Sequence, residues 1–233
     1  MLIFLDLQTT GDESAEAICA VALLSDENLL YNLVNEGKKI TPHASSIHNI
    51  TNEMIRDAAA FREGDAYKYL QKHNQQANIL VTHNAPLHMQ MLDSHGICWQ
   101  GDVIDTMRVA KHLFSDSELF SLQYLRYEMK LYRQEEQLKR SYGIKCAFVA
   151  NEAKSSVCIT KLLFDSLSEM VNADAMKKLS LQKVLLSKIP FGKYQGHYIE
   201  EIKAQDPRYL QWMLGLAELD EDLRYSLEYY LQG

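Results

Sequence analysis

The sequence predicts an α/β protein with a mixed sheet flanked by helices and a small C-terminal module. After three initial strand-like segments, short apolar runs alternate with longer stretches of helical spacing, which is typical of such a sheet. The 233 residues are 47% hydrophobic and 24% charged, as expected for a chain that buries a substantial core. A stretch with one proline and two glycines, residues 188–196, then interrupts the helical pattern and indicates a boundary.

Five segments have the length and composition of buried strands. Residues 2–7, 17–24 and 29–34 are expected to form a meander, with a turn at residues 25–28 between the last two. Residues 78–82 and 103–105 are predicted as two further strands. Helices are expected at residues 45–58 and 66–73, from Pro86, from Thr106, around Leu122 and Leu125, and over residues 149–171.

The chain is expected to divide into three parts. Residues 1–172 form the main domain, residues 173–187 a basic linker or helix, and residues 188–233 the C-terminal module. In the module, one helix is predicted to begin at Asp206-Pro207, because proline is favoured in the first turn of a helix. A last helix is predicted from about residue 220 to residue 231.

Charge and composition exclude several classes of protein. The net charge of −7 does not favour a protein that coats nucleic acid through bulk charge. The four cysteines show no CxxC spacing, so we expect reduced thiols. No apolar run reaches the roughly 18 residues of a membrane span, and no signal-peptide pattern follows Met1. We therefore expect a cytoplasmic protein without membrane association.

One basic segment contrasts with the acidic chain. Residues 175–199 contain five lysines and no acid: Lys177, Lys178, Lys183, Lys188 and Lys193. Such a segment either contacts phosphates or forms a solvated face.

Several short motifs follow one another along the main domain. Residues 4–11 are Phe-Leu-Asp-Leu-Gln-Thr-Thr-Gly, residues 46–51 are Ser-Ile-His-Asn-Ile-Thr, and residues 83–88 are His-Asn-Ala-Pro-Leu-His. Residues 105–108 are Asp-Thr-Met-Arg, and residues 146–151 are Cys-Ala-Phe-Val-Ala-Asn. This order resembles the DEDDh (DnaQ-like) 3′-to-5′ exonucleases, whose motifs are Asp-x-Glu-Thr-Thr-Gly, Ile-His-x-Ile-Thr, His-Asn-Ala-x-Phe-Asp, Asp-Thr-Met and His-x-x-x-x-Asp.

The C-terminal module extends this resemblance. Residues 191–196, Phe-Gly-Lys-Tyr-x-Gly, and residues 206–212, Asp-Pro-x-Tyr-Leu-x-Trp, are similar to the tail of the exodeoxyribonuclease X family. The resemblance thereby covers nearly the whole chain. It implies an RNase H-like α/β domain for the first part of the chain.

The resemblance also implies a chemistry that this chain has mostly lost. The family uses two divalent metal ions to cleave a phosphodiester, with a histidine as general base. Its four carboxylates and its histidine fall, in that order, on Asp6, Gln8, His88, Asn151 and Cys146. Hard cations need anionic oxygen ligands, and only Asp6 retains one. We expect a vestigial site without Mg²⁺ or other cofactor, or, if the chain is active, a site that uses Mg²⁺ or Mn²⁺.

Two substitutes for the lost ligands can be considered. Asp93 follows His88 by five residues, about 500° around a helix, so it is expected to point away from the site. Asp6, His88 and Cys146 together would offer oxygen, nitrogen and sulfur ligands, which suit Zn²⁺. The alternative is that these three side chains only pack or form hydrogen bonds.

Candidate nucleic-acid contacts lie in both parts of the chain. The resemblance implies that Thr9 and Thr10 lie where the family's backbone and hydroxyl groups meet the terminal nucleotide; the alternative is that they are ordinary turn residues. The His83-Asn84 pair either orients a strand end or caps it locally. In the module, an aromatic side chain beside lysines can stack on a base, although such aromatics more often form a core. The candidates are Thr9, Thr10, His83, Asn84, Lys188, Lys193 and Tyr194.

Three functional hypotheses follow. In the first, the chain is a catalytically inactive exonuclease homologue that binds single-stranded DNA, a nucleic-acid 3′ end, or a replication or repair protein. In the second, it is an active 3′-to-5′ DNA exonuclease with a rearranged metal site. In the third, it is a structural or protein-interaction domain that does not bind nucleic acid.

Overall fold

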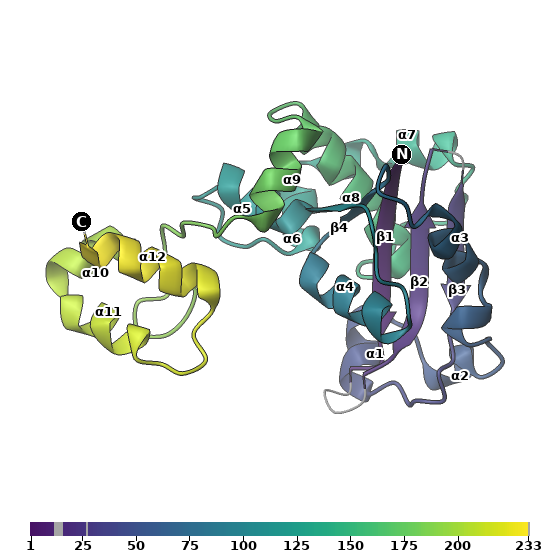
Figure 1. The fold of residues 1–233 in the computed structure, drawn as a ribbon, viewed down its shortest axis with the longest axis horizontal. Coiled ribbons are helices and arrows are strands. Elements are labelled where there is room, and N and C mark those ends of the chain that lie inside the picture. Colours follow the sequence, from purple (N-terminus) through teal and green to yellow (C-terminus); the bar gives the residue numbers. More distant parts are fainter. Residues whose placement is uncertain (12–15, 27, 233) are drawn as a thin grey trace.

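A five-stranded mixed sheet forms the centre of the main domain (Figure 1). The computed structural model describes residues 1–11, 16–26 and 28–232. The strand order is β3-β2-β1-β4-β5, with β1–β2 and β2–β3 antiparallel and β1–β4 and β4–β5 parallel. The strands are β1 (Leu2–Thr9), β2 (Ile18–Leu24), β3 (Leu29–Leu33), β4 (Ile79–Thr82) and β5 (Asp102–Asp105). All five strands were predicted; Glu27, in the predicted turn between β2 and β3, lies outside the described residues.

Helices cover both faces of the sheet. The main part of the chain contains α1 (Pro42–His48), α2 (Asn52–Ile55), η1 (Phe61–Glu63), α3 (Asp65–His73), α4 (Ala85–Ser94), α5 (Thr106–Leu113), α6 (Leu122–Glu128), η2 (Leu131–Arg133), α7 (Glu135–Ser141), α8 (Ala153–Ser168) and α9 (Ala173–Leu181). The C-terminal module contains α10 (Ile199–Gln205), α11 (Pro207–Leu214) and α12 (Glu221–Gln232). Among the described helices, none combines the length and the apolar character that a membrane crossing requires.

The alternation of side chains along β1 divides the core into two layers. Phe4 packs edge-on against Phe164 of α8, with ring centroids 5.5 Å apart, in a layer that also includes parts of α5, α6 and α7. Ile3, Leu5 and Leu7 point to the opposite face and pack against α3 and α4. Asp6 and Gln8 follow Phe4 at intervals of two, so they lie on the α8 face of β1.

Two predicted helices differ from the observed ones for local reasons. The single helix expected at residues 45–58 is two short helices, because Asn49 adopts a left-handed conformation (φ 63°) and ends α1. The helix expected over residues 149–171 begins only at Ala153, because Asn151 is also left-handed (φ 59°). In the segment before α8, the Val149 N–H donates to the Ser155 hydroxyl at 2.8 Å. Helices α7 and α10 were not predicted.

The carboxylate of Asp105 joins the ends of two strands to the starts of two helices. Its oxygens accept hydrogen bonds from the N–H groups of Asn84 (3.0 Å) and Ala85 (2.9 Å), where β4 leads into α4. They also accept from Met107 (2.9 Å) and Arg108 (3.3 Å), in the first turn of α5. Asp105 is buried, so water could not accept hydrogen bonds from these four N–H groups if the carboxylate were removed.

The C-terminal module lies to one side of the sheet and is attached through α5 and α12 (Figure 1). The Arg108 guanidinium donates to the buried Asp222 carboxylate at 2.7 Å, and the Val184 N–H donates to the same oxygen at 2.9 Å. Helix α9 packs on the main domain, where Met176 is buried and the Ser180 hydroxyl accepts from the Asp105 N–H. The division into parts at residues 172/173 and 187/188 stays a prediction.

Asp105→Asn should lower the free energy of unfolding by about 2–4 kcal/mol. The amide nitrogen of Asn would face N–H donors and leave part of the four-donor set unpaired in a buried position. Urea denaturation at pH 7 measures the change. Asp102→Asn is the matched control, because Asp102 lies at the exposed start of the same strand and pairs with Lys177 at 3.0 Å; a change within about 0.5 kcal/mol is expected. Equal losses for both variants would contradict this role of Asp105.

Candidate functional site

Asp6 and Gln8 form the centre of the predicted site on β1. The Gln8 Nε2 donates a hydrogen bond to Asp6 Oδ2 at 2.6 Å. The Asp6 side chain is buried, and burial raises its pKa to about 7, while the Gln8 hydrogen bond lowers it by a smaller amount. An amide thus lies against the Asp6 carboxyl, at the position that the motif resemblance matches to a second carboxylate of the family.

Thr9 and Thr10 use their hydroxyl groups within the fold. The Thr9 hydroxyl donates to the carboxylate of Glu16. The Thr10 hydroxyl is buried and accepts from the Ala17 N–H at 3.1 Å. Gly11 follows in a left-handed conformation (φ 69°), and a Cβ there would come within 2.8 Å of Ala44 Cβ. This part of the first motif is therefore a packed turn whose hydroxyls already have protein partners.

His48 and Asn49 link the first motif to the segment of residues 146–151. Its Nδ1 accepts from the Ile50 N–H at 3.1 Å, so its proton is on Nε2, which lies 3.1 Å from the Thr9 carbonyl oxygen. Burial lowers the pKa of His48 and favours this neutral form. The neighbouring Asn49 amide donates to the Ala150 carbonyl at 3.4 Å. The Ile-His-x-Ile-Thr stretch was noted in the sequence, but this bridging role of its histidine was missed, as was the proximity of Glu16 to Thr9.

His88 is buried on α4 and neutral. Its Nε2 lies 3.1 Å from the His83 carbonyl oxygen, which can only accept, so the proton is on Nε2. Burial lowers the pKa of His88 to about 4, against a smaller opposite effect of the His83 hydrogen bond. The other nitrogen, Nδ1, is buried and has no hydrogen-bond partner among the described residues. His88 is therefore uncharged, whereas the family motif that residues 83–88 resemble has an aspartate at this position.

His83 and Asn84 cap the end of β4. The two ring nitrogens of His83 lie 2.9 Å from the Thr106 hydroxyl and 2.8 Å from the Phe120 carbonyl oxygen. Burial lowers the pKa of His83 and favours the neutral ring. Asn84 has a left-handed backbone (φ 70°) as the N-cap residue of α4, and its side chain is exposed. His83 is occupied within the fold, whereas the Asn84 amide is free to meet a ligand.

Cys146 and Asn151 lie in the segment before α8. Cys146 is exposed, and Asn151 is half-buried in its left-handed turn. The contact between Asn49 and Ala150 brings this segment next to the His48 turn and thus toward the end of β1. Over residues 1–11, 16–26 and 28–232, no three His, Cys, Asp or Glu side chains are grouped so as to hold a metal ion. Asp6 and His88 are buried and Cys146 is exposed, and the zinc hypothesis for these three residues stays a prediction.

These donors do not fit the two divalent ions that the exonuclease resemblance implies. A pair of Mg²⁺ ions in one cleft needs several carboxylates to offset four positive charges. The matched positions supply one carboxyl whose burial favours the neutral form, two amides, a neutral imidazole and a thiol. The Gln8 amide already occupies one oxygen of the single carboxyl.

The remaining candidates lie in the C-terminal module. Lys188 Nζ lies 4.8 Å from the centre of the Tyr198 ring and 3.3 Å from the Asp116 carbonyl oxygen. Lys193 Nζ lies 4.5 Å from the centre of the Tyr194 ring and pairs with Asp206 at 3.2 Å. The predicted contacts thus fall into two groups, one at the ends of the strands and one in the module.

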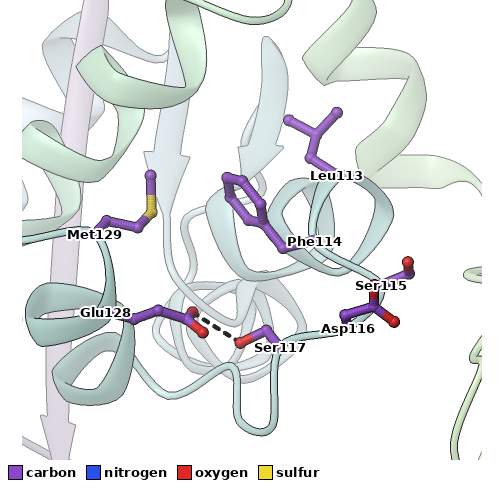
Figure 2. A pocket seen from close by; sticks show the side chains of 7 residues that line it. All are labelled: Leu113, Phe114, Ser115, Asp116, Ser117, Glu128 and Met129. Carbon is purple, nitrogen blue, oxygen red and sulfur yellow. Dashed lines mark hydrogen bonds between the residues drawn. The ribbon is translucent and has the colours of Figure 1, made fainter.

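A hollow of about 510 Å³ opens beside the C-terminal end of α5 (Figure 2). The Ser117 hydroxyl donates to the Glu128 carboxylate at 2.8 Å across it. The hollow is lined by Leu113, Phe114, Ser115, Asp116, Ser117, Glu128 and Met129. This lining contains no Lys, Arg or His, so it is unfavourable for binding a phosphate. None of the predicted site residues lines it.

Comparison with known families shows to which class of protein this chain belongs. The family model described as Exonuclease matches residues 3–136, more than half of the chain. The chain therefore belongs to this exonuclease family, and its main domain has the RNase H-like fold of the DEDDh exonucleases. A second model, Exodeoxyribonuclease X-like C-terminal, matches residues 189–215.

Individual relatives agree with this assignment. Exodeoxyribonuclease 10 of Escherichia coli strain K12 is 26% identical over 239 residues, which covers 100% of both chains. A solved structure of exonuclease X in complex with 5′ overhanging duplex DNA has a TM-score of 0.59 and 22% identity, and covers 77% of this chain and 99% of that one. The nuclease domain of 3′hExo, a DEDDh family member bound to rAMP, has a TM-score of 0.53 and 12% identity, over 73% and 93% of the two chains. The predicted resemblance and fold class are confirmed.

Asp6→Asn should change the pH dependence of stability. In the unfolded chain Asp6 ionises near its ordinary pKa of 3.8, whereas in the folded chain it ionises near 7. Between these values the folded state binds more protons, so the wild-type chain loses stability as the pH rises, by roughly 4 kcal/mol in all. Asp6→Asn has no charge to bury. It should match the wild type near pH 4 and be more stable at pH 8.

Urea denaturation at pH 4.5 and pH 8, in EDTA, measures this difference. Asp93→Asn is the matched control, because Asp93 is exposed on α4. This variant should follow the pH dependence of the wild type. If the stability of Asp6→Asn shows the same pH dependence as the wild type, burial of the Asp6 carboxylate is not the cause of that dependence.

Proposed function

We propose that this chain binds the 3′ end of single-stranded DNA and does not cleave it. The observation that carries the proposal is the Gln8–Asp6 hydrogen bond of 2.6 Å at the position of two family metal ligands. The Gln8 amide donates a hydrogen bond to the carboxylate oxygen that, in a two-metal nuclease, would bind a metal ion. The fold of the family is retained, whereas the ligands of its ions are replaced.

The replaced residues remove the charge that would repel DNA from an ion-free site. Phosphates approaching several carboxylates are repelled unless cations lie between them. At the matched positions Gln8, His88 and Asn151 are neutral, and burial keeps Asp6 largely protonated below a pKa of about 7. The strand-end site can therefore receive a phosphodiester without metal ions, with the exposed Asn84 amide as one available hydrogen-bonding group.

The choice of DNA rests on the relatives. The Escherichia coli relative is named as an exodeoxyribonuclease, and the solved exonuclease X is in complex with duplex DNA that has a 5′ overhang. A replication or repair protein as a further partner stays a hypothesis, for which no described contact argues.

The wild-type chain should not degrade single-stranded DNA in Mg²⁺ or Mn²⁺. Restoring the family residues with Gln8→Glu, His88→Asp, Cys146→His and Asn151→Asp together should produce metal-dependent release of nucleotides from the 3′ end. Gel electrophoresis of a 5′-labelled oligonucleotide measures both, with circular dichroism to show that the restored variant is folded. Degradation by the wild type that is lost in Asp6→Ala would show an active enzyme. A folded restored variant without activity would contradict the matching of the motifs.

Binding to a fluorescein-labelled oligonucleotide should be as strong in EDTA as in Mg²⁺. Gln8→Glu should weaken binding in EDTA by about 5-fold, because it adds a negative charge beside Asp6. Gln137→Glu makes the same charge change on the exposed surface of α7 and should have little effect. Fluorescence anisotropy measures these affinities, with circular single-stranded DNA as a competitor that has no 3′ end. Equal competition by circular and linear strands would contradict end binding.

A further inference from the structure

We propose that the loop of residues 188–198 and helix α11 form a second binding surface, on which bases of single-stranded DNA stack. The proposal depends on the proposed function for the identity of the nucleic acid. The surface itself is argued from the aromatic rings, the charges and the loop geometry of the C-terminal module, which lies apart from the strand-end site (Figure 1).

Three aromatic side chains of this surface lie in a row, from Tyr194 through Tyr209 to Trp212. Tyr194 packs edge-on against Tyr209, with ring centroids 4.9 Å apart, and Tyr209 lies 5.5 Å from Trp212. Tyr194 and Tyr209 are partly buried against the module's core, whereas Trp212 is 59% exposed and Phe191 is 44% exposed. A role in the core explains the two tyrosines but does not explain Trp212 and Phe191.

The loop is built so that it presents its side chains in one arrangement. An isolated bridge between Lys188 and Tyr198 closes it, and the Gly196 N–H donates to the Ile189 carbonyl at 2.8 Å. Gly192 has a left-handed backbone (φ 81°), and a Cβ there would lie 2.6 Å from the Tyr209 hydroxyl oxygen. This close approach seats the loop on α11 and holds Phe191 and Lys193 on either side of Gly192.

The loop of residues 188–198 and helix α11 are basic, whereas the rest of the module is acidic. Residues 188–198 and α11 carry Lys188, Lys193 and Arg208 and no acid, whereas the acids of the module lie mainly at residues 200–201 and 218–228. Asp206, between α10 and α11, accepts from both Lys193 Nζ and the Tyr194 hydroxyl, so the charges of Asp206 and Lys193 offset each other and Lys188 and Arg208 supply the remaining positive charge. Arg208 is exposed on α11, four residues before Trp212.

A single strand fits this combination of exposed rings and cations. Bases of a single strand can stack on Trp212 and Phe191 while its phosphates meet Arg208. In a duplex the faces of the bases are stacked on one another, so a duplex offers these rings only the base pairs at its ends. The occupant is therefore single-stranded DNA.

Trp212→Ala and Phe191→Ala should each weaken binding of the full chain to a 20-nucleotide thymidine strand by about 5-fold or more. Trp212→Phe should recover most of the affinity, since it restores a stacking face. Tyr229→Ala is the matched control, because Tyr229 is 55% exposed on α12 of the same module; its affinity should equal that of the wild type. Circular dichroism melting checks that each variant is folded.

Tryptophan fluorescence tests the contact directly. The chain has two tryptophans, and Trp99 is buried in the main domain. Binding of DNA should quench the wild-type emission, and the quenching should be absent in Trp212→Phe, where only Trp99 emits. An abasic strand of the same length should bind without quenching.

The outcomes separate this inference from the proposed function. If the wild type binds and Trp212→Ala and Phe191→Ala bind equally well, the stacking surface is refuted and end binding stands. Loss of affinity in these variants together with loss of quenching supports the surface. If the wild type binds no single-stranded DNA at low salt, both proposals are overturned.

Discussion

The four hydrogen bonds accepted by the buried Asp105 carboxylate are the contact on which the arrangement of the site depends. They tie the end of β4 to the end of β5 and fix the first turns of α4 and α5 at the same point. An N-terminal helix turn exposes N–H groups that must find acceptors, and a single carboxylate supplies them for both helices. His83, Asn84 and His88 take their positions from this junction, because all three lie at the start of α4 or just before it.

This frame does not require a metal ion, so the positions of the site can persist while its chemistry changes. Asp105 is satisfied by backbone groups, His48 by backbone groups on either side, and Asp6 by the Gln8 amide. A carboxylate in the place of Gln8 would lack such a partner unless a cation joined the two. The Gln8 amide thus gives Asp6 a hydrogen-bond partner that needs no ion.

The strands and most helices could be predicted because their signals are local. Apolar runs of strand length and helical spacing are visible in the sequence, and the ordered motifs placed the site residues on their elements. The break at Asn49 and the late start of α8 depend on left-handed backbone at single residues, which apolar spacing does not show. The zinc hypothesis depends on the proximity of Cys146 to the buried Asp6 and His88, a tertiary property that residue spacing along the chain does not show. His48 and Glu16 were missed for the same reason, since their partners near Thr9 appear only once the turn is folded.

Helix α5 connects the two regions that we propose to contact DNA. Asp105 caps its first turn on the side of the strand ends, and Arg108, in that same turn, donates to the Asp222 carboxylate of α12. The Val184 N–H shares this carboxylate, so the entry into the module is held by the contact that holds α12. A single turn of helix therefore places both the strand-end site and the module.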